Sequence, residues 1–342
     1  GGRLVLNDCT WVITTTSPSN IDGQNDRLME ARADYGQDFE GEISINGLMI
    51  ELNQAWAGPN LILLNIPAIT YNHGRDTCVA QDISIKDVRV RCGPLVGEGT
   101  VFRLIPVSLG ARNTSGSGHK VFWPRAITID DIDFENATDT ASLHVQLLVN
   151  NYSHESVYVR GRSAKPTAEQ GTNADISLSR LRSVHPSDYL AINSDATVSI
   201  QDSVTIWSAH YQNDDDAWKP RLTIDDCNHV WLDTILNGRL IVSRSTVHRY
   251  QKDKGGAGNV TVNFIGCDIR PMDRNPVEGT ATYTFALDGA VFVGSSFYIP
   301  LNDNGTFTNA MPLTGAKGAG NVLAGGAVSG THYTSVPAGF FV

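Results

Sequence analysis

The chain repeats a short pattern of hydrophobic and polar positions. In each copy two apolar residues flank a polar one, two polar or small residues follow, and the alternation resumes at a residue that is usually apolar or small. This pattern is typical of a strand, a bend and a second strand. The clearest copies are Leu4-Val-Leu-Asn-Asp-Cys9, Ile43-Ser-Ile-Asn-Gly-Leu48, Ile83-Ser-Ile-Lys-Asp-Val88, Ile127-Thr-Ile-Asp-Asp-Ile132, Ile176-Ser-Leu-Ser-Arg-Leu181, Val198-Ser-Ile-Gln-Asp-Ser203, Leu222-Thr-Ile-Asp-Asp-Cys227 and Val260-Thr-Val-Asn-Phe-Ile265, with weaker copies at Leu240 and Val291.

The spacing of the copies predicts a parallel β-solenoid. Copies begin 22 residues apart at Ile176 and Val198 and 24 apart at Val198 and Leu222, whereas earlier gaps of 40, 44 and 49 residues require long insertions or an additional turn. A repeat of this length, rich in β-branched residues and without a helical apolar stripe, must stack on its neighbours to bury its inner face.

Three other architectures are alternatives. A β-sandwich has a turn every 8 to 12 residues or so, without a repeated word. A leucine-rich repeat has a Leu/Asn consensus, and a propeller has four strands in roughly 40 residues. The repeated word favours the solenoid over all three.

On words such as Ile127-Thr-Ile-Asp-Asp-Ile132 and Leu222-Thr-Ile-Asp-Asp-Cys227, the chain resembles right-handed parallel β-helix proteins of the pectate-lyase-like superfamily. It is most similar to bacteriophage tailspikes and the polysaccharide depolymerases related to them, over about residues 40 to 300. The resemblance is architectural and transfers no catalytic residue. It implies a slender homotrimeric spike, attached to other virion proteins, that contacts a surface glycan through the flank of its helix.

The expected organisation has three parts. Residues 1–42 form an N-terminal strand and a polar loop, residues 43–300 form a single-stranded right-handed parallel β-helix with long loop insertions, and residues 301–342 form a Gly-rich C-terminal cap or oligomer contact. Within the polar segment 17–41, we expect a large loop or a short helix around Arg27 to Arg32. The aromatic residues of the C-terminal segment favour packing over a flexible tail.

Charge and hydropathy restrict the partners. The 342 residues carry 36 acidic and 26 basic side chains, a net charge of −10, which argues against nucleic acid or an anionic membrane as a partner. The longest apolar runs, such as Leu61 to Leu64, fall far short of the roughly 20 residues of a membrane-crossing helix. The first residues lack both an initiator Met and a secretory signal, so we expect an N-terminal part to be missing.

The five cysteines are Cys9, Cys78, Cys92, Cys227 and Cys267. Their odd number and the absence of CxxC spacing favour buried thiols over a disulfide framework or a zinc site. This usage suggests synthesis in a reducing cytoplasm. The expected location of the folded protein is the virion, with secretion as the alternative.

Stacking places residues of successive copies side by side, about 4.8 Å apart. If Ile83, Ile127 and Ile176 are equivalent, Arg89, Asp133 and Arg182 share one outward row, and Arg91 lies beside Glu135. These alternating charges predict an exposed ionic ladder, with a sugar-binding face as the alternative reading.

The same logic pairs Asp202 with Asp226, which occupy one repeat position in successive copies. Two carboxylates roughly 5 Å apart disfavour double ionisation, which is how a glycosidase obtains an acid and a base. The alternative is that both aspartates end strands at a bend, where Asp is common. With Asp215, they are the candidate catalytic residues.

The segment from Trp207 to Arg221 is the most chemically varied part of the chain. Aromatic rings suit the C–H faces of sugars, and charged groups suit their hydroxyls. The segment can equally be a solvated loop, and its acidic run lacks the spacing of a calcium loop. The candidate substrate-binding residues are Trp207, His210, Tyr211, Asp214, Asp216, Trp218, Lys219 and Arg221.

Lyase chemistry needs a base beside a uronate carboxylate and a cation to stabilise the enolate. Lys219, Arg221, His210 and Tyr211 are the residue types that fill these roles, and no spacing distinguishes a lyase from a hydrolase. The chain has no nucleophile elbow, P-loop, zinc-protease motif or dinucleotide fingerprint, and we expect neither a metal nor a cofactor.

Three functions follow as hypotheses. The first is a phage tailspike-like receptor-binding protein that recognises a bacterial surface polysaccharide and, in its catalytic form, depolymerises it. The second is a non-catalytic structural spike or decoration protein of a virion. The third is a secreted monomeric polysaccharide lyase or epimerase.

Overall fold

The computed structural model shows an all-β chain, as the sequence predicts. In the described part of the chain, every helix or strand assigned is a strand, so no helix there is long and apolar enough to cross a membrane. The structure describes residues 2–13, 26–30, 41–52, 61–69, 77–78, 80, 82–92, 102–112, 121–124, 126–135, 141–143, 145–147, 157–159, 175–181, 190–192, 197–203, 209–210, 221–228, 230–235, 238–252, 260–273, 289–302, 305–307 and 309–342.

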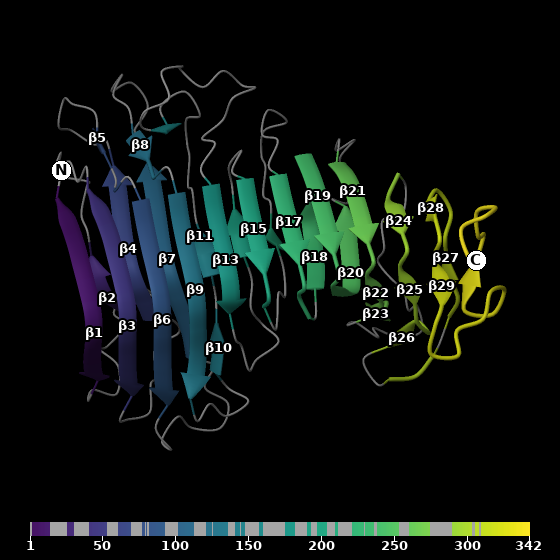
Figure 1. The fold of residues 1–342 in the computed structure, drawn as a ribbon, viewed down its shortest axis with the longest axis horizontal. Helices are drawn as coiled ribbons and strands as arrows, with labels where there is room; N and C mark the ends of the chain where they lie inside the picture. Colours follow the sequence, from purple (N-terminus) through teal and green to yellow (C-terminus); the bar gives the residue numbers. More distant parts are fainter. Residues whose placement is uncertain are drawn as a thin grey trace.

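An eleven-stranded parallel sheet extends along the molecule, with the two chain ends at its opposite ends (Figure 1). Its strands lie side by side in chain order, and all but the last coincide with one of the ten predicted copies of the repeat. They are β1 (Arg3–Ile13), β3 (Glu42–Leu52), β6 (Asp82–Cys92), β9 (Ala126–Glu135), β13 (Asp175–Leu181), β15 (Thr197–Gln201), β17 (Arg221–Asp225), β19 (Gly238–Ser243), β21 (Val260–Ile265), β24 (Val291–Val293) and β28 (Lys317–Ala319).

The strand register confirms most of the predicted repeat. From Leu4 to Leu240, the first apolar residue of each copy pairs with the first apolar residue of the next. The predicted register is wrong for the last two copies, those at Val260 and Val291. Leu240 pairs with Val262 rather than Val260, and Val291 pairs with Asn263. The copy at Val260 is therefore displaced by two residues, because its alternation starts two residues before the equivalent position.

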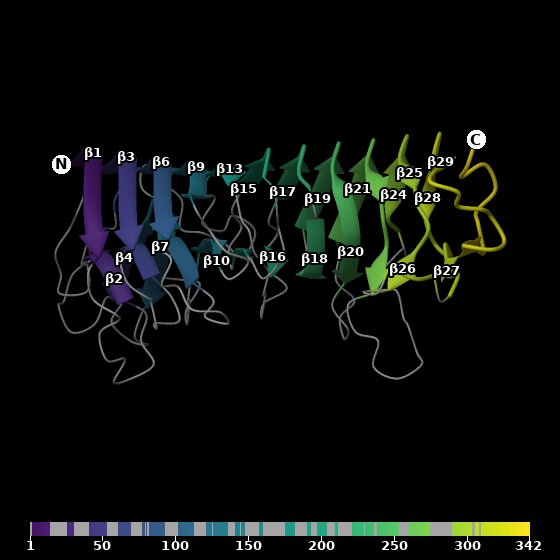
Figure 2. The same cartoon turned by 90° about the horizontal axis from the view of Figure 1, so that it is seen from below.

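The remaining strands form smaller parallel sheets. Figure 2 shows several of these strands, among them β4, β7, β18 and β20, in a second layer beside the eleven-stranded sheet. The sheets are β10 (Ala141–Leu143), β7 (Phe102–Arg112), β4 (Leu61–Ile69) and β2 (Asp26–Glu30); β11 (Val145–Leu147), β14 (Leu190–Ile192) and β16 (Ala209–His210); β12 (Val157–Val159), β8 (Val121–Trp123) and β5 (Thr77–Cys78); β18 (Val230–Ile235), β20 (Thr246–Lys252), β22 (Asp268–Ile269), β25 (Ser296–Phe297) and β29 (Val322–Leu323); β23 (Met272–Asp273) and β26 (Leu301–Asn302); and β27 (Met311–Pro312) and β30 (Tyr333–Thr334).

One of these strands corrects the sequence analysis. Residues Asp26–Glu30, for which a loop or a short helix was expected, form strand β2 and pair with Leu61 to Asn65 of β4; residues 17–25 and 31–40 lie outside the described residues. Leu28 and Met29 are half-buried and pack against the core. Five residues are too short for a helical period to be distinguished from a strand, so pairing with β4 determines the conformation.

The core lies behind the eleven-stranded sheet. Successive strand residues point to opposite faces, so the apolar residues of each copy share the inner face. Ile45, Ile85 and Ile129, neighbours in β3, β6 and β9, are each 0% exposed. Burial of one such side chain contributes about 1.5–3 kcal/mol. The inner faces of β4, β7 and β18 contribute further buried residues, among them Leu64 and Val107.

A row of small polar side chains is buried beside this apolar core. It consists of Ser203, Cys227, Ser245, Cys267, Ser295 and Asn321, one from each of six successive copies. Backbone N–H groups of one copy donate to the row in the next, as in Cys227 to Ser245 Oγ (3.0 Å) and Cys267 to Ser295 Oγ (3.1 Å). The row therefore satisfies backbone groups that the bend removes from the regular ladder.

The two buried cysteines of this row are free thiols, as predicted, and Cys9 is free and half-buried. Burial raises the pKa of both Cys227 and Cys267 to about 11, against the smaller opposite effect of backbone hydrogen bonds. The side chains of Cys78 and Cys92 lie outside the described part of the structure.

Aromatic residues hold the C-terminal segment against the last strands of the sheet. The rings of Phe264 and Phe292 stack with centroids 4.8 Å apart, and Phe340 packs edge-on against Phe292 and Phe297. Tyr333 and Phe340 are fully buried. The segment 309–342 thus covers the end of the core, because each ring fills space that a further repeat would occupy.

Candidate functional site

Every copy of the repeat bends at one residue with a positive φ. In chain order these are Asp8, Gly47, Asp87, Asp131, Arg180, Asp202, Asp226, Arg244, Gly266, Gly294 and Gly320. Gly adopts this conformation without strain, and Asp tolerates it better than most residues. Asp202 (φ 45°) and Asp226 (φ 52°) are therefore bend residues, which is the structural alternative that the sequence left open.

The two candidate catalytic aspartates lie in directly adjacent copies. Gln201 pairs with Asp225, and the backbone N–H of Asp202 donates to Asp225 O at 3.2 Å, so no further strand separates them. The bends on either side of the pair are occupied by Arg180 and Arg244. The guanidinium groups of these arginines bond to Asp130 and Asp225.

The other predicted site residues are only partly described. Arg221 is exposed at the start of β17, and His210 belongs to β16, in a different sheet. The structure therefore places these two on separate sheets. The remaining candidates, Trp207, Tyr211, Asp214, Asp215, Asp216, Trp218 and Lys219, lie outside the described residues.

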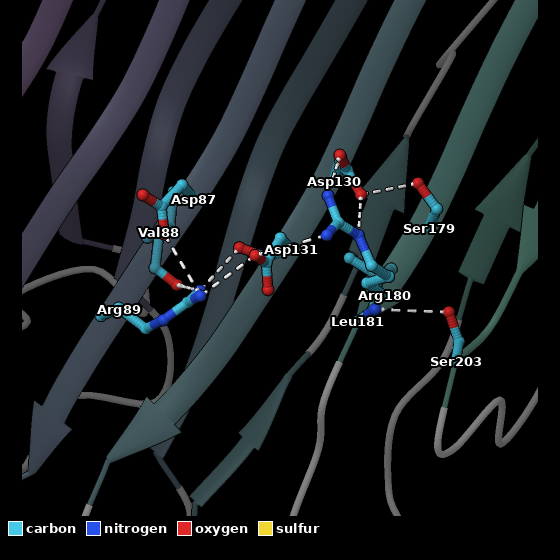
Figure 3. A network of polar contacts seen from close by, with 9 residues as sticks. All are labelled: Asp87, Val88, Arg89, Asp130, Asp131, Ser179, Arg180, Leu181 and Ser203. Atoms are coloured by element: carbon cyan, nitrogen blue, oxygen red, sulfur yellow. Dashed lines mark hydrogen bonds and ion pairs between the residues drawn. The ribbon is translucent and has the colours of Figure 1, made fainter.

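The N-terminal half of the outer sheet face carries an ionic network (Figure 3). Arg89 bonds to Asp131 (3.0 Å) and reaches Asp87 (3.2 Å), and Arg180 bonds to Asp130 (2.6 Å). The hydrogen bond from Arg180 lowers the pKa of Asp130 against the opposite effect of burial, and the bond to Asp131 raises the pKa of Arg89. These charges are compensated within the network.

The predicted ionic ladder is confirmed as an ion pair for Arg91 and Glu135, and only in register for Arg89 and Asp133. Arg91 lies beside Glu135 as expected, at 3.0 Å, and also bonds to Glu51 at 2.8 Å. Arg89 and Asp133 are register partners, but the Arg89 guanidinium bonds to Asp131 instead. Arg182 lies outside the described residues.

A row of hydroxyl side chains on the same face was not recognised as a candidate from the sequence. It consists of Ser44, Ser84, Thr128, Ser177, Ser199 and Thr223, which pair in register across six successive strands. The last three are exposed. The signal was the central polar letter of each repeated word, which is Ser or Thr in all six. We call this set the hydroxyl row.

The hydroxyl row and the charges beside it form an extended polar surface on a rigid sheet. Each hydroxyl both donates and accepts hydrogen bonds, which matches the chemistry of sugar hydroxyls. Within the described ranges, no group of three or more His, Cys, Asp or Glu side chains is arranged to hold a metal ion. The surface is therefore suited to binding a polar polymer along the sheet.

Comparisons of the chain with protein-family models, with curated proteins and with solved structures found no match.

Proposed function

We propose that the chain is a right-handed parallel β-helix that binds a bacterial surface polysaccharide, as a phage tailspike-like receptor-binding protein. The coil is supported by the strand order, because the chain leaves the eleven-stranded sheet after each strand and returns to pair in parallel with the strand it left. Right-handed crossovers are strongly preferred for such connections.

The observation that carries the proposed function is the hydroxyl row. Six hydroxyl residues repeat at the strand spacing of about 4.8 Å on one face. An extended glycan presents hydroxyls repeatedly along its length, so it can contact several members at once. Multiple weak hydrogen bonds on a rigid surface suit recognition of a polymer better than of a single small molecule.

The proposal includes cleavage of the bound glycan. Asp202 and Asp226 lie in adjacent copies at the edge of the face that carries the hydroxyl row, which supports an acid and a base there. A separation near 5 Å would favour retention, and a larger one inversion. The homotrimer and the virion location belong to the same proposal and follow from the resemblance alone.

The test is a panel of capsular polysaccharides, lipopolysaccharide O-chains and uronate polymers. Binding is measured with wild type, with Ser199→Ala/Thr223→Val, and with the control Thr331→Val at an exposed site in the C-terminal segment. Loss of binding in the double variant alone supports the proposal. A wild-type protein that binds no glycan refutes it and leaves the structural spike as the better hypothesis.

The same panel separates the catalytic hypotheses. Reducing ends report hydrolysis, and absorbance of an unsaturated product reports elimination. Asp226→Asn should then retain binding but lose product formation, and normal turnover in that variant would remove the acid–base assignment. A stable monomer that turns over uronate polymers would favour the secreted lyase or epimerase.

A further inference from the structure

Two arginines are stacked on the outer face of the sheet. Arg221 of β17 pairs in register with Arg239 of β19, and both side chains are exposed. Neighbouring strands are about 4.8 Å apart, so the two guanidinium stems begin side by side. Their outer neighbours in the row are Thr197 and Thr261, both exposed and uncharged.

The other arginines of this sheet and its bends have carboxylate partners. Arg3 pairs with Glu42 (3.1 Å), and Arg244 pairs with Asp225. Arg89, Arg91 and Arg180 are paired in the same way. In the described part of the chain, Arg221 and Arg239 form no ion pair, although acidic side chains outnumber basic ones in this protein by 36 to 26.

Like charges placed directly across a strand pair are destabilising. The chain has ten more acidic than basic side chains, so carboxylates are available to pair with these arginines. Other arginines on this face are paired with carboxylates in this way. A local conflict of this kind is typical of a functional site rather than of a structural one.

We infer that Arg221 and Arg239 bind an oxyanion, a carboxylate or a phosphate, carried by an acidic polysaccharide. This inference rests on the proposed function and specifies its substrate class. Guanidinium groups bind both anions through paired N–H donors. Thr223 of the hydroxyl row lies two residues after Arg221 on the same face, so one polymer can contact the arginines with its anion and the row with its hydroxyls.

The test uses acidic capsular polysaccharides, each beside its carboxyl-reduced neutral form, together with poly(glycerol phosphate). Affinities are measured for wild type, Arg221→Gln/Arg239→Gln and the control Arg3→Gln/Arg91→Gln, whose arginines lie in β1 and β6. The control removes the same number of charges from arginines that have carboxylate partners. We expect about tenfold weaker binding of an acidic polymer in the first variant, with a smaller salt dependence, and less than about twofold change in the control.

Each outcome decides the inference. Preference for a carboxylated capsule or for poly(glycerol phosphate) identifies the anion. Equal losses in both double variants would show an effect of bulk charge and overturn the inference. Binding of neutral forms as tightly as acidic ones would also overturn it, while leaving glycan binding intact. Absence of binding to every polymer, acidic or neutral, would refute the proposed function as well.

Discussion

Asn321 joins the end of the sheet to the C-terminal segment, and its removal should release that segment. The side chain is 0% exposed. Its Oδ1 accepts from the Ser295 N–H at 3.0 Å, and its Nδ2 donates to Phe292 O at 3.2 Å and to Phe340 O at 3.1 Å. Asn321→Ala removes all three bonds and leaves the partners buried.

The magnitude follows from the partners. An orphaned N–H costs about 1–3 kcal/mol, and each lost bond to a carbonyl costs about 0.5–1.5 kcal/mol, so the total is about 2–6 kcal/mol. In a stack of repeats each unit contacts mainly its neighbours. The destabilisation should therefore be confined to the C-terminal end of the molecule.

Hydrogen exchange measured by mass spectrometry tests this directly. In Asn321→Ala, the free energy of opening should fall in peptides that cover residues 333–341 and remain unchanged in β3. Asn228→Ala is the control, because that side chain is exposed. A fall of less than about 1 kcal/mol at residues 333–341, or an equal fall in β3, would refute the reasoning.

Three further predictions follow. Arg180 lowers the pKa of Asp130 from its ordinary 3.8, so their bond stabilises the fold above about pH 4 and is lost as pH falls through the lower, folded-state pKa. Asp130→Asn should lower the free energy of unfolding by less than about 1 kcal/mol at pH 7 and leave it unchanged in strong acid. Urea unfolding of wild type and variant at both pH values measures the difference. Burial raises the pKa of Cys227 and Cys267 to about 11. Both thiols should therefore react with iodoacetamide at pH 8 at least about a hundredfold more slowly than a free thiol. Peptide mapping by mass spectrometry measures the rate at each cysteine, and rates equal to that of a free thiol would contradict their burial. Gly266→Ala should lose about 1–2 kcal/mol for its φ of 59°, and Gly318→Ala should lose more because a Cβ there would lie 1.8 Å from Phe292 O; equal thermal stabilities would contradict the clash.

The register of the sheet was largely predictable because the bend residue sets it. The residue four positions before the bend is a buried apolar residue of each copy after the first: Ile127 lies four residues before Asp131, and Leu222 lies four residues before Asp226. The alternation of apolar and polar residues does not fix the register by itself, because the pattern is unchanged when the strand is shifted by two residues. That ambiguity produced the displaced copy at Val260, and the bend at Gly266 resolves it in favour of Val262.

Other features needed the structure because they depend on pairing between distant segments. Strand β2 is five residues long and is fixed by its pairing with β4, not by its own pattern. The donors of the buried polar row come from the preceding copy, so Ser245 and Ser295 carry no local signal of their role. The adjacency of Arg221 and Arg239 likewise requires the copy at Leu240, whose word is the least regular of the series.

The character of the outer face changes along the sheet, and the change restricts where a ligand can bind. At the position before the bend, the copies from β1 to β19 carry polar residues, from Asn7 to Ser243, whereas β21 and β24 carry Ile265 (45% exposed) and Val293 (47% exposed). The arginines of β1 and β6 are held in ion pairs, and β21 and β24 carry exposed apolar residues. The strands from β13 to β19 combine exposed hydroxyls with Arg221 and Arg239, which form no ion pair among the described residues. Because stacking repeats each position at a fixed spacing, a few substitutions in consecutive copies are enough to create such a zone on an otherwise uniform scaffold.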